Sequence, residues 1–513
     1  MASESSQSKP ECVPAREILR FFSPRWFIAI MGTGALANIF QLIADRAPIW
    51  HHLAVGLMTL CLAAYPVVLA LLICRLWLDR GMVVKELRHS SLVQFYSAVF
   101  IAAAICATGL LKIPLPYLSA DTALFLAKGF WGFAAVVGAA LAVFTPWRII
   151  TLNHGEPRRI LGFWFLPPVG LFVLVFAGNF LALQPSNIGW IEPMAVFNAL
   201  ALGIASFQTL ALFTLFLFRG LAYPFPREDV VPSFTIGMAP VGVSIIAFLS
   251  YQPLLAKAAI PGLEVAAIVP LIKLGCVLLW GFGLWWLLVN IGIIATAYAR
   301  KGIPVTLGYW AFVFPPAAYT IASILLGQAT GIEFIQKTGF VLAMIMAAVW
   351  CVIFLLTIRA VFNRRIFILP PSFQELLAGD AAPQDGLTLV KFQDKFPVFR
   401  IDIRKSDRLR SAADVVEAIK KKIVAHPVAK HIADFDHFNH TKAIGGEMPS
   451  GLVNAVNVVF CFGPKIDDVL VLGVRPRAFG IGEFKEHFSI SFMESPSPQA
   501  TDTMKDWAQS LAS

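Results

Sequence analysis

Ten long apolar runs constrain this sequence more than any other feature. A helix needs about 20 mostly apolar residues to cross the hydrocarbon core of a membrane. With 58% hydrophobic and 14% charged residues, the chain cannot hide its apolar surface in water. We therefore predict a multi-pass membrane protein with spans at about residues 27–44, 53–76, 92–111, 124–145, 163–182, 194–218, 232–252, 266–298, 308–327 and 338–362.

Basic residues are distributed unequally between the two ends of these spans. Up to residue 375, the segments on the side of the N-terminus hold 18 Lys and Arg residues, whereas the opposite segments hold only Arg46, Lys112, Lys128, Lys257 and Lys337. Lys and Arg gather on the cytoplasmic side of membrane proteins. We therefore expect a cell membrane location, inner or plasma, with both termini in the cytoplasm.

The formal net charge of +10 is explained by the same distribution. Residues 376–513 hold 17 basic and 17 acidic residues, so the whole excess lies in the apolar part of the chain. The charge is therefore an orientation signal, and we expect a lipid bilayer rather than nucleic acid as the partner of these residues.

The odd-numbered spans contain similar sequence blocks. The four blocks are Phe27–Gly34, Phe163–Gly170, Thr235–Gly242 and Ala311–Ala318, and their last residues are 136, 72 and 76 positions apart. The first step is close to two repeats, and the missing block falls at residues 98–103. We predict an all-α membrane part in which ten transmembrane helices form five repeated helical hairpins around a central pore. The even-numbered helices then lie outside.

Glycine and proline recur within these blocks. Proline removes an intrahelical hydrogen bond and glycine allows close approach of backbones. Such breaks are tolerated in lipid where the freed groups face protein or a watery cavity. The alternative is that both residues are simply more frequent in membrane helices, but their alignment favours a central cavity. We expect kinks at Gly32, Gly34, Pro168, Gly170, Pro240, Gly242, Pro315 and Pro316.

A large apolar residue lies four positions before the end of each block. The four residues are Ile30, Leu166, Met238 and Phe314. If they point inward, they form a hydrophobic constriction that gates the pore by excluding water. Phe314 is the largest and is the predicted gate, with Phe312 on another face of the same helix as the competing candidate. The alternative is ordinary packing between helices.

The predicted spans are almost free of charge. They lack the row of Asp and Glu residues that a proton relay or a cation path requires, and Lys273 is the one charge well inside a span. A pore without acids and with basic cytoplasmic mouths favours small anions. Four amides either hydrogen-bond a permeant ion or bridge helices, and we favour bridging: Asn38, Asn179, Gln208 and Asn290.

Two motifs resemble a known family. Phe22-Ser-Pro-Arg-Trp-Phe27 is followed by Met31-Gly-Thr-Gly34, and Tyr309-Trp-Ala-Phe-Val-Phe-Pro315 lies in the ninth span. Residues 15–365 thereby resemble the tellurite-resistance/dicarboxylate transporter family, which includes bacterial TehA-type channels, plant slow anion channels, and fungal malate carriers and sulfite exporters. The resemblance implies an anion pore inside five inner helices, a homotrimer, and a phenylalanine of the ninth helix that occludes the pore. By motif, that residue is Phe314.

The composition changes beyond Arg365. We expect a cytoplasmic N-terminal segment at 1–22, a transmembrane transport domain at 23–365, a linker at 366–386 and a small soluble cytoplasmic α+β domain at 387–513. Ser411 and Asp414 have the spacing of a capping box that opens a helix to about residue 424, and a second helix is expected at 500–512. Predicted strands lie at 387–392, 397–403, 453–462, 468–474 and 487–493.

One stretch of this domain is rich in metal-ligating side chains. His437 and His440 are three residues apart, which on a helix places both on one face, and Asp436 is close enough to supply an oxygen. The alternative is a polar loop. We expect no cofactor elsewhere, and nothing indicates an enzyme.

Three functions are compatible with these features. The leading hypothesis is passive or weakly coupled movement of a small inorganic or organic anion through the pore. The alternatives are a proton-coupled carrier or exporter of C4-dicarboxylate or sulfite, and a membrane-anchored sensor that acts through its cytoplasmic domain. The sequence does not name the anion.

Overall fold

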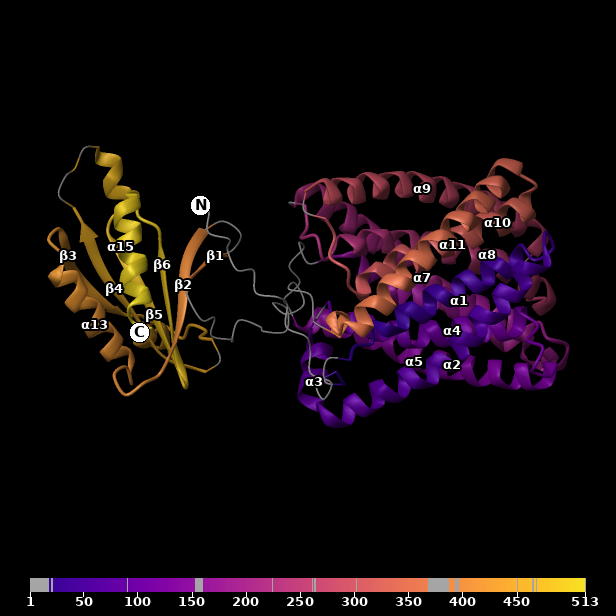
Figure 1. Ribbon diagram of the computed structural model, residues 1–513, viewed down its shortest axis with the longest axis horizontal. Coiled ribbons are helices and arrows are strands. Elements are labelled where there is room, and N and C mark those ends of the chain that lie inside the picture. Colours follow the sequence, from indigo (N-terminus) through magenta and orange to yellow (C-terminus); the bar gives the residue numbers. More distant parts are fainter. Residues whose placement is uncertain are drawn as a thin grey trace. The chain divides into compact units, whose positions relative to one another are not determined.

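The computed structural model describes two compact units that divide the chain at residue 377, the first helical and the second built around a sheet (Figure 1). The described residues are 18–19, 22–89, 91–152, 160–223, 225–260, 262, 264–300, 302–367, 387–392, 396–449, 451–463, 466 and 468–512. Residues 368–386 of the predicted linker and most of the predicted N-terminal segment lie outside them.

The first unit is a multi-pass membrane domain. Among the described residues, nine helical segments are long and apolar enough to cross a membrane. A further apolar helix, α1 (Trp26–Leu42), has 17 residues, so the tenth span stays a prediction. The other long helices are α2 (Pro48–Leu78), α4 (Ser97–Lys112), α5 (Ala120–Leu152), α6 (Leu166–Ala182), α7 (Ile191–Ala222), α8 (Met238–Ala258), α9 (Val265–Arg300), α10 (Phe314–Thr330) and α11 (Glu333–Phe362). A short helix, α3 (Arg80–Arg88), follows α2.

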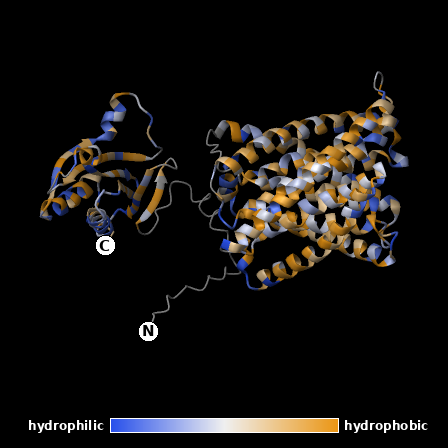
Figure 2. Cartoon of the chain, turned by 90° about the horizontal axis from the view of Figure 1, so that it is seen from above, coloured by the Kyte–Doolittle hydropathy of each residue, from blue (hydrophilic) through white to orange (hydrophobic). Residues whose placement is uncertain are grey.

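Burial divides these helices into an inner and an outer set. The apolar windows of the segments that contain α4, α6, α8 and α10 are 83–94% buried, whereas those of α2, α5, α7, α9 and α11 are at most 28% buried. Most residues of α1 are buried as well. We call α1, α4, α6, α8 and α10 the inner helices. Large apolar side chains of the outer helices are exposed, among them Phe125, Phe207 and Leu271, as lipid contact requires. The hydropathy colouring shows the helical unit as predominantly hydrophobic (Figure 2).

Four of the inner helices begin with a 3₁₀ segment. These segments are η2 (Val93–Tyr96), η4 (Gly162–Phe165), η6 (Val231–Gly237) and η7 (Leu307–Phe312), before α4, α6, α8 and α10 respectively. Pro168, Pro240, Pro315 and Pro316 all lie within the first three residues of the α-helix that follows. A proline costs little there, because the first N–H groups of an α-helix have no partner within it. The structure thus places these prolines at helix starts, not in helix interiors.

The glycines of the repeated blocks lie where inner helices touch. A Cβ atom at Gly34 would come within 2.5 Å of the side chain of Ile105 on α4, and one at Gly170 would collide with Phe100 of α4. A Cβ atom at Gly242 would lie 2.5 Å from the backbone of α10. At Gly32 it would lie 2.9 Å from Val313, beside the start of α10. Glycine therefore sets the close spacing of the inner helices.

The second unit is a six-stranded antiparallel sheet with the order β1-β2-β6-β5-β4-β3. Two helices, α13 (Ala412–Ala425) and α15 (Pro498–Gln509), cover one face, where Ile419 and Met504 pack against sheet residues such as Phe460. The strands are β1 (Thr388–Phe392), β2 (Phe396–Arg404), β3 (Ala429–Asp436), β4 (Leu452–Phe462), β5 (Arg477–Phe484) and β6 (His487–Met493). The predicted α+β domain is confirmed.

The capping box at the start of α13 is also confirmed, with Ser411 and Asp414 each accepting from the other's backbone N–H. The predicted strand at 468–474 is wrong. Asp468 accepts from the backbone N–H of Leu470, and a 3₁₀ turn, η10 (Val469–Val474), follows. Such local side-chain bonds favour turns over strands.

We expect Gly242→Ala to lower the stability of the membrane unit. The added methyl group would push α8 away from the backbone of α10, and overpacking of this kind costs about 1–3 kcal/mol. The measurement is the midpoint of heat-induced aggregation of the purified protein in detergent. Gly203→Ala on α7 is the control, because no atom lies within 4 Å of its added Cβ. Equal midpoints for both variants would contradict this packing role.

Candidate functional site

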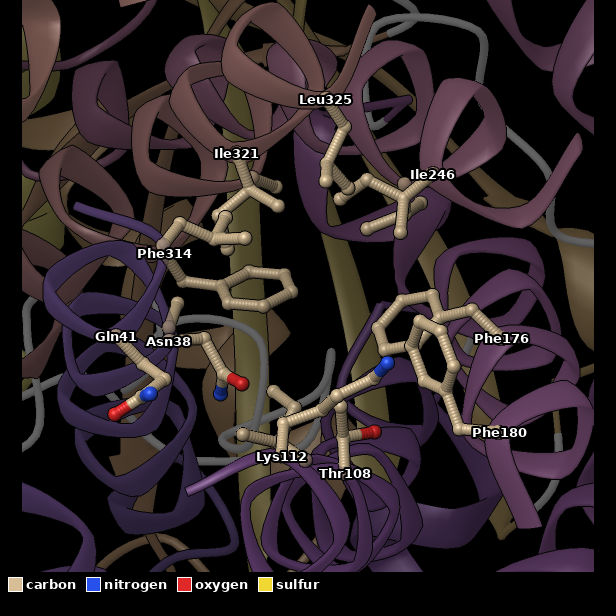
Figure 3. A pocket seen from close by; sticks show the side chains of 15 residues that line it. Asn38, Gln41, Thr108, Lys112, Phe176, Phe180, Ile246, Phe314, Ile321 and Leu325 are labelled. Carbon is tan, nitrogen blue, oxygen red and sulfur yellow. The ribbon is translucent and has the colours of Figure 1, made fainter. Parts of the chain in front are cut away.

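A cavity of about 330 Å³ lies among the five inner helices (Figure 3). Every inner helix contributes to its wall. The lining residues are Ala35, Asn38, Gln41 and Leu42 from α1, Ile105, Thr108 and Lys112 from α4, Phe176 and Phe180 from α6, Val243 and Ile246 from α8, and Phe314, Ala318, Ile321 and Leu325 from α10. Apart from Phe314, they come from the middle and the C-terminal turns of these helices. One end of the helix assembly is therefore hollow.

Phe314 lies at the inner end of this cavity. It is the first residue of α10, with 3% of its surface exposed, and its ring points into the cavity (Figure 3). Phe312, the competing candidate, lies outside the cavity in η7, where its ring packs 5.6 Å from the ring of Tyr309. Of the predicted gate and constriction residues, Phe314 is the one that lines the central cavity.

A second, smaller cavity of about 40 Å³ lies at the opposite ends of the same helices. Its wall again draws on all five, through residues such as Ile28 before the middle of α1, Phe95 of η2 and Phe163 of η4. Arg25 also lines it and donates from Nε to the hydroxyl of Ser23 at 3.1 Å. Burial lowers the pKa of this guanidinium to about 10, which still leaves it charged at neutral pH. Asp229 lines it as well, so this mouth is small and holds side chains of both charges.

Two buried apolar residues lie along the chain between the residues of the two cavities. They are Leu166 and Met238, and 2% and 0% of their surfaces are exposed. Ile30 is also buried, but it borders a different pocket, between α1, α2 and α11. Leu166 and Met238 therefore stay predicted constriction residues, whereas Ile30 lines this other pocket instead of the central cavity.

The wall of the central cavity is mostly apolar. Four lining residues are polar, Asn38, Gln41, Thr108 and Lys112, and none of the lining residues is acidic. The amide of Asn38 donates to the carbonyl oxygen of Gly34 at 2.8 Å. The hydroxyl of Thr108 donates to the carbonyl oxygen of Ala104 at 2.9 Å. Gln41 has its Oε1 atom 3.0 Å from Nδ1 of His51 on α2.

Other polar groups of the spans bind helices together. Asn179 on α6 donates to the hydroxyl of Ser250 on α8 at 2.9 Å and accepts from Asn198 on α7 at 2.7 Å. The amide of Asn290 donates to the carbonyl oxygen of Trp286 in its own helix. Lys273 on α9 donates to the carbonyl oxygen of Ala329 in the last turn of α10 at 2.8 Å, a favourable place for a positive charge. Of the four amides considered from the sequence, Asn38 alone lines the central cavity.

The predicted metal ligands of the second unit serve other roles. Asp436 accepts hydrogen bonds from the backbone and side-chain amides of Asn439, and both lower the pKa of its carboxyl group. The rings of His437 and His440 pack against Phe435. The described residues contain no group of three or more His, Cys, Asp or Glu side chains that is able to hold a metal ion. His437 and His440 lie three residues apart on the short helix α14 (His437–Ala443), as predicted, and Asp436 directly precedes it, but the three side chains do not form such a group.

The sequence reasoning missed Lys112 as a residue of the cavity. It counted only as one of the few basic residues on the side opposite the N-terminus. Lys112 lies in the last turn of α4, and small or polar residues precede it by three and four positions, which places them on the same helix face. This pattern was the available signal. The sequence did not show that this face of α4 lines a cavity, because the repeat block of α4 has lost its glycine and proline.

Two family profiles match separate parts of the chain. The profile of the voltage-dependent anion channel family (SLAC1) matches residues 21–358. That of a family of unknown function (DUF6858) matches residues 387–513. The first match covers the helical unit with its cavity, and the second covers the sheet and its helices.

Curated relatives match the helical part. An uncharacterized transporter of Methanocaldococcus jannaschii is 28% identical over 356 residues, which is 68% of this chain and 97% of the relative. The sulfite efflux pump SSU1 of Trichophyton rubrum is 26% identical over 67% of this chain and 92% of its own length. The malic acid transport protein of Schizosaccharomyces pombe is 24% identical over 43% of this chain and 50% of its own length. Because the match to the helical part covers 97% of the archaeal relative, almost none of that relative remains to correspond to the second unit.

We expect the two cavities to open on opposite sides of the membrane. A membrane-impermeant thiol reagent added outside intact cells should label Leu325→Cys, which lines the central cavity, and spare Thr306→Cys, which lines the small one. Inside-out vesicles should give the reverse. Labelling is read by mass shift against the parent chain, which corrects for the native cysteines. Labelling of both variants from the same side would contradict the arrangement.

Proposed function

The chain belongs to the voltage-dependent anion channel family, and on this premise we propose that its helical unit moves small anions through a central pore occluded by Phe314. One observation carries the proposal. Phe314 lines a cavity that is bounded by all five inner helices, and its ring points into that cavity. A hydrophobic constriction of this kind prevents ion passage by excluding water.

The charges along the path support an anion. No lining residue of the central cavity is acidic, and Lys112 contributes a positive charge there, whereas Arg25 and Asp229 both line the opposite mouth. A cation would meet no compensating carboxylate in the central cavity, and an uncompensated charge in apolar surroundings is costly. An anion in the central cavity meets the positive charge of Lys112.

The orientation follows from the basic residues. We propose that both termini face the cytoplasm, so that the small cavity with Arg25 is the cytoplasmic mouth and the larger cavity faces outward. The cell membrane is the proposed location. A homotrimer remains an expectation from the family resemblance.

The main alternative is a coupled carrier. The relatives named as a sulfite efflux pump and a malic acid transport protein favour this possibility over a sensor. A carrier for sulfite or a C4-dicarboxylate would show flux that is driven by a pH gradient. A pore would instead show currents whose reversal potential follows the anion gradient.

We expect Phe314→Ala to raise anion current. Removal of the ring widens and wets the constriction, and a barrier lowered by about 1.4 kcal/mol raises the current about tenfold. The measurement is the current of the purified protein in planar bilayers, with reversal potentials for chloride, nitrate, sulfite and malate gradients.

Phe312→Ala is the matched control, because it removes the same ring two residues away and outside the central cavity. Its current should stay close to that of the parent chain. Unchanged current in Phe314→Ala, in protein shown to be folded by size-exclusion chromatography, would remove the gate assignment. If neither the two variants nor the parent chain carries current under any anion gradient, the channel proposal fails.

We expect anion flux to survive deletion of the second unit. A chain that ends after residue 367 retains the region matched by the anion channel family, and the archaeal relative is covered almost to its full length by that part. The readout is anion flux into proteoliposomes, normalised to reconstituted protein. Loss of flux from a folded, truncated protein would favour the sensor alternative, in which the cytoplasmic domain performs the function.

A further inference from the structure

Lys112 is the single charged residue of the central cavity wall. It lies at the C-terminal end of α4, and although this helix is almost wholly buried, Lys112 itself is exposed because its side chain faces the cavity (Figure 3). Its Nζ atom lies 3.7 Å from the ring centre of Phe180 on α6. The ammonium group is therefore held against one side of the cavity by a cation–π contact.

The charge of Lys112 has no carboxylate beside it. Among the described residues, no acidic side chain forms an ion pair with it, whereas Lys337 pairs with Glu333 and Arg75 pairs with Glu86. A positive charge in a mostly apolar cavity favours the presence of a counter-charge. The cavity has space for a mobile one, because its volume is about 330 Å³.

Further polar groups border the same space. Thr108 lies one turn before Lys112 on the same face of α4, and Asn38 projects from α1. The hydrogen bond of the Asn38 amide to Gly34 uses one of its two N–H groups. The second N–H and the ammonium group are donors, and donors are what an anion requires.

We propose that Lys112, together with Phe180 and Asn38, forms a binding site for the permeant anion and selects monovalent over divalent anions. This proposal rests on the proposed function. One ammonium group compensates one negative charge. A divalent anion would carry a second, uncompensated charge into apolar surroundings that include Phe176, Ile246 and Ile321, which is unfavourable. Nitrate, chloride or hydrogensulfite therefore fits this site better than sulfate or doubly ionised malate.

The test measures anion flux into proteoliposomes that contain the full-length protein, with chloride, nitrate and sulfate as probes. For Lys112→Gln we expect the half-saturating chloride concentration to rise about fivefold or more, since a unit charge about 4 Å from an anion contributes at least this factor even in water. The preference for nitrate over sulfate should fall with it. Lys112→Arg should keep both properties, because it keeps the charge.

Lys257→Gln is the matched control. Lys257 is an exposed residue in the last turn of α8, at the same end of the inner helices but outside the cavity, so its loss changes only the surface charge. It should leave both readouts unchanged. Gln41→Lys is the opposite variant, because a second ammonium group in the cavity should raise the relative flux of sulfate.

The outcomes separate this inference from the proposed function. If the parent protein carries no anion flux, the proposed function fails. If it carries flux, but Lys112→Gln changes neither half-saturation nor the preference for nitrate over sulfate, the site at Lys112 is refuted while the pore stands. Equal effects of Lys257→Gln and Lys112→Gln would also refute it, because the effect would then arise from surface charge.

Discussion

The close approach of five helices is the interaction on which the rest of this structure depends. In a membrane, lipid is as apolar as the helices, so association rests on packing and on interhelical hydrogen bonds rather than on exclusion of water. Glycine at positions 34, 170 and 242 removes the side chains that would otherwise separate the inner helices. At the C-terminal ends, the same helices enclose a cavity. On α1 and α8 the contact and the cavity are formed by adjacent residues, because Ala35 and Val243, which follow Gly34 and Gly242, line the cavity.

The positions of the spans could be predicted from the sequence, because apolar runs of this length have few other structural solutions. The predicted run at 53–76 lies inside α2 (Pro48–Leu78), and the run at 338–362 lies inside α11 (Glu333–Phe362). The helix ends were missed by several residues, since helices continue past the apolar region. The change from 3₁₀ to α-helix at the prolines was also missed, because both forms tolerate proline in a first turn.

The repeat alignment located Phe314 but not the cavity-facing residues of every helix. It aligned Ala318 with Gly34 and Gly242, whereas the cavity is lined by Ala318, Ala35 and Val243. One residue corresponds to about 100° around an α-helix. Glycine marks the contact between neighbouring helices, and the cavity face lies one residue further along α1 and α8. A pattern of small residues therefore located the helix contacts better than the pore wall. In the second unit, strand β5 was missed because Gly480 and Gly482 weaken its strand signal, and β3 was missed because Asp434 and Asp436 do so.

The central cavity is complete within a single chain, and this determines what an oligomer is able to add. Each of its lining residues comes from the inner helices of one copy, so a second copy has no wall residue to contribute. The surfaces left for lipid or for another copy belong to the outer helices, whose exposed side chains are apolar, such as Phe125, Phe207 and Leu271. In an assembly of such chains, each copy would keep its own path and its own Phe314. Total current would then scale with the number of copies, and selectivity would be a property of the single chain.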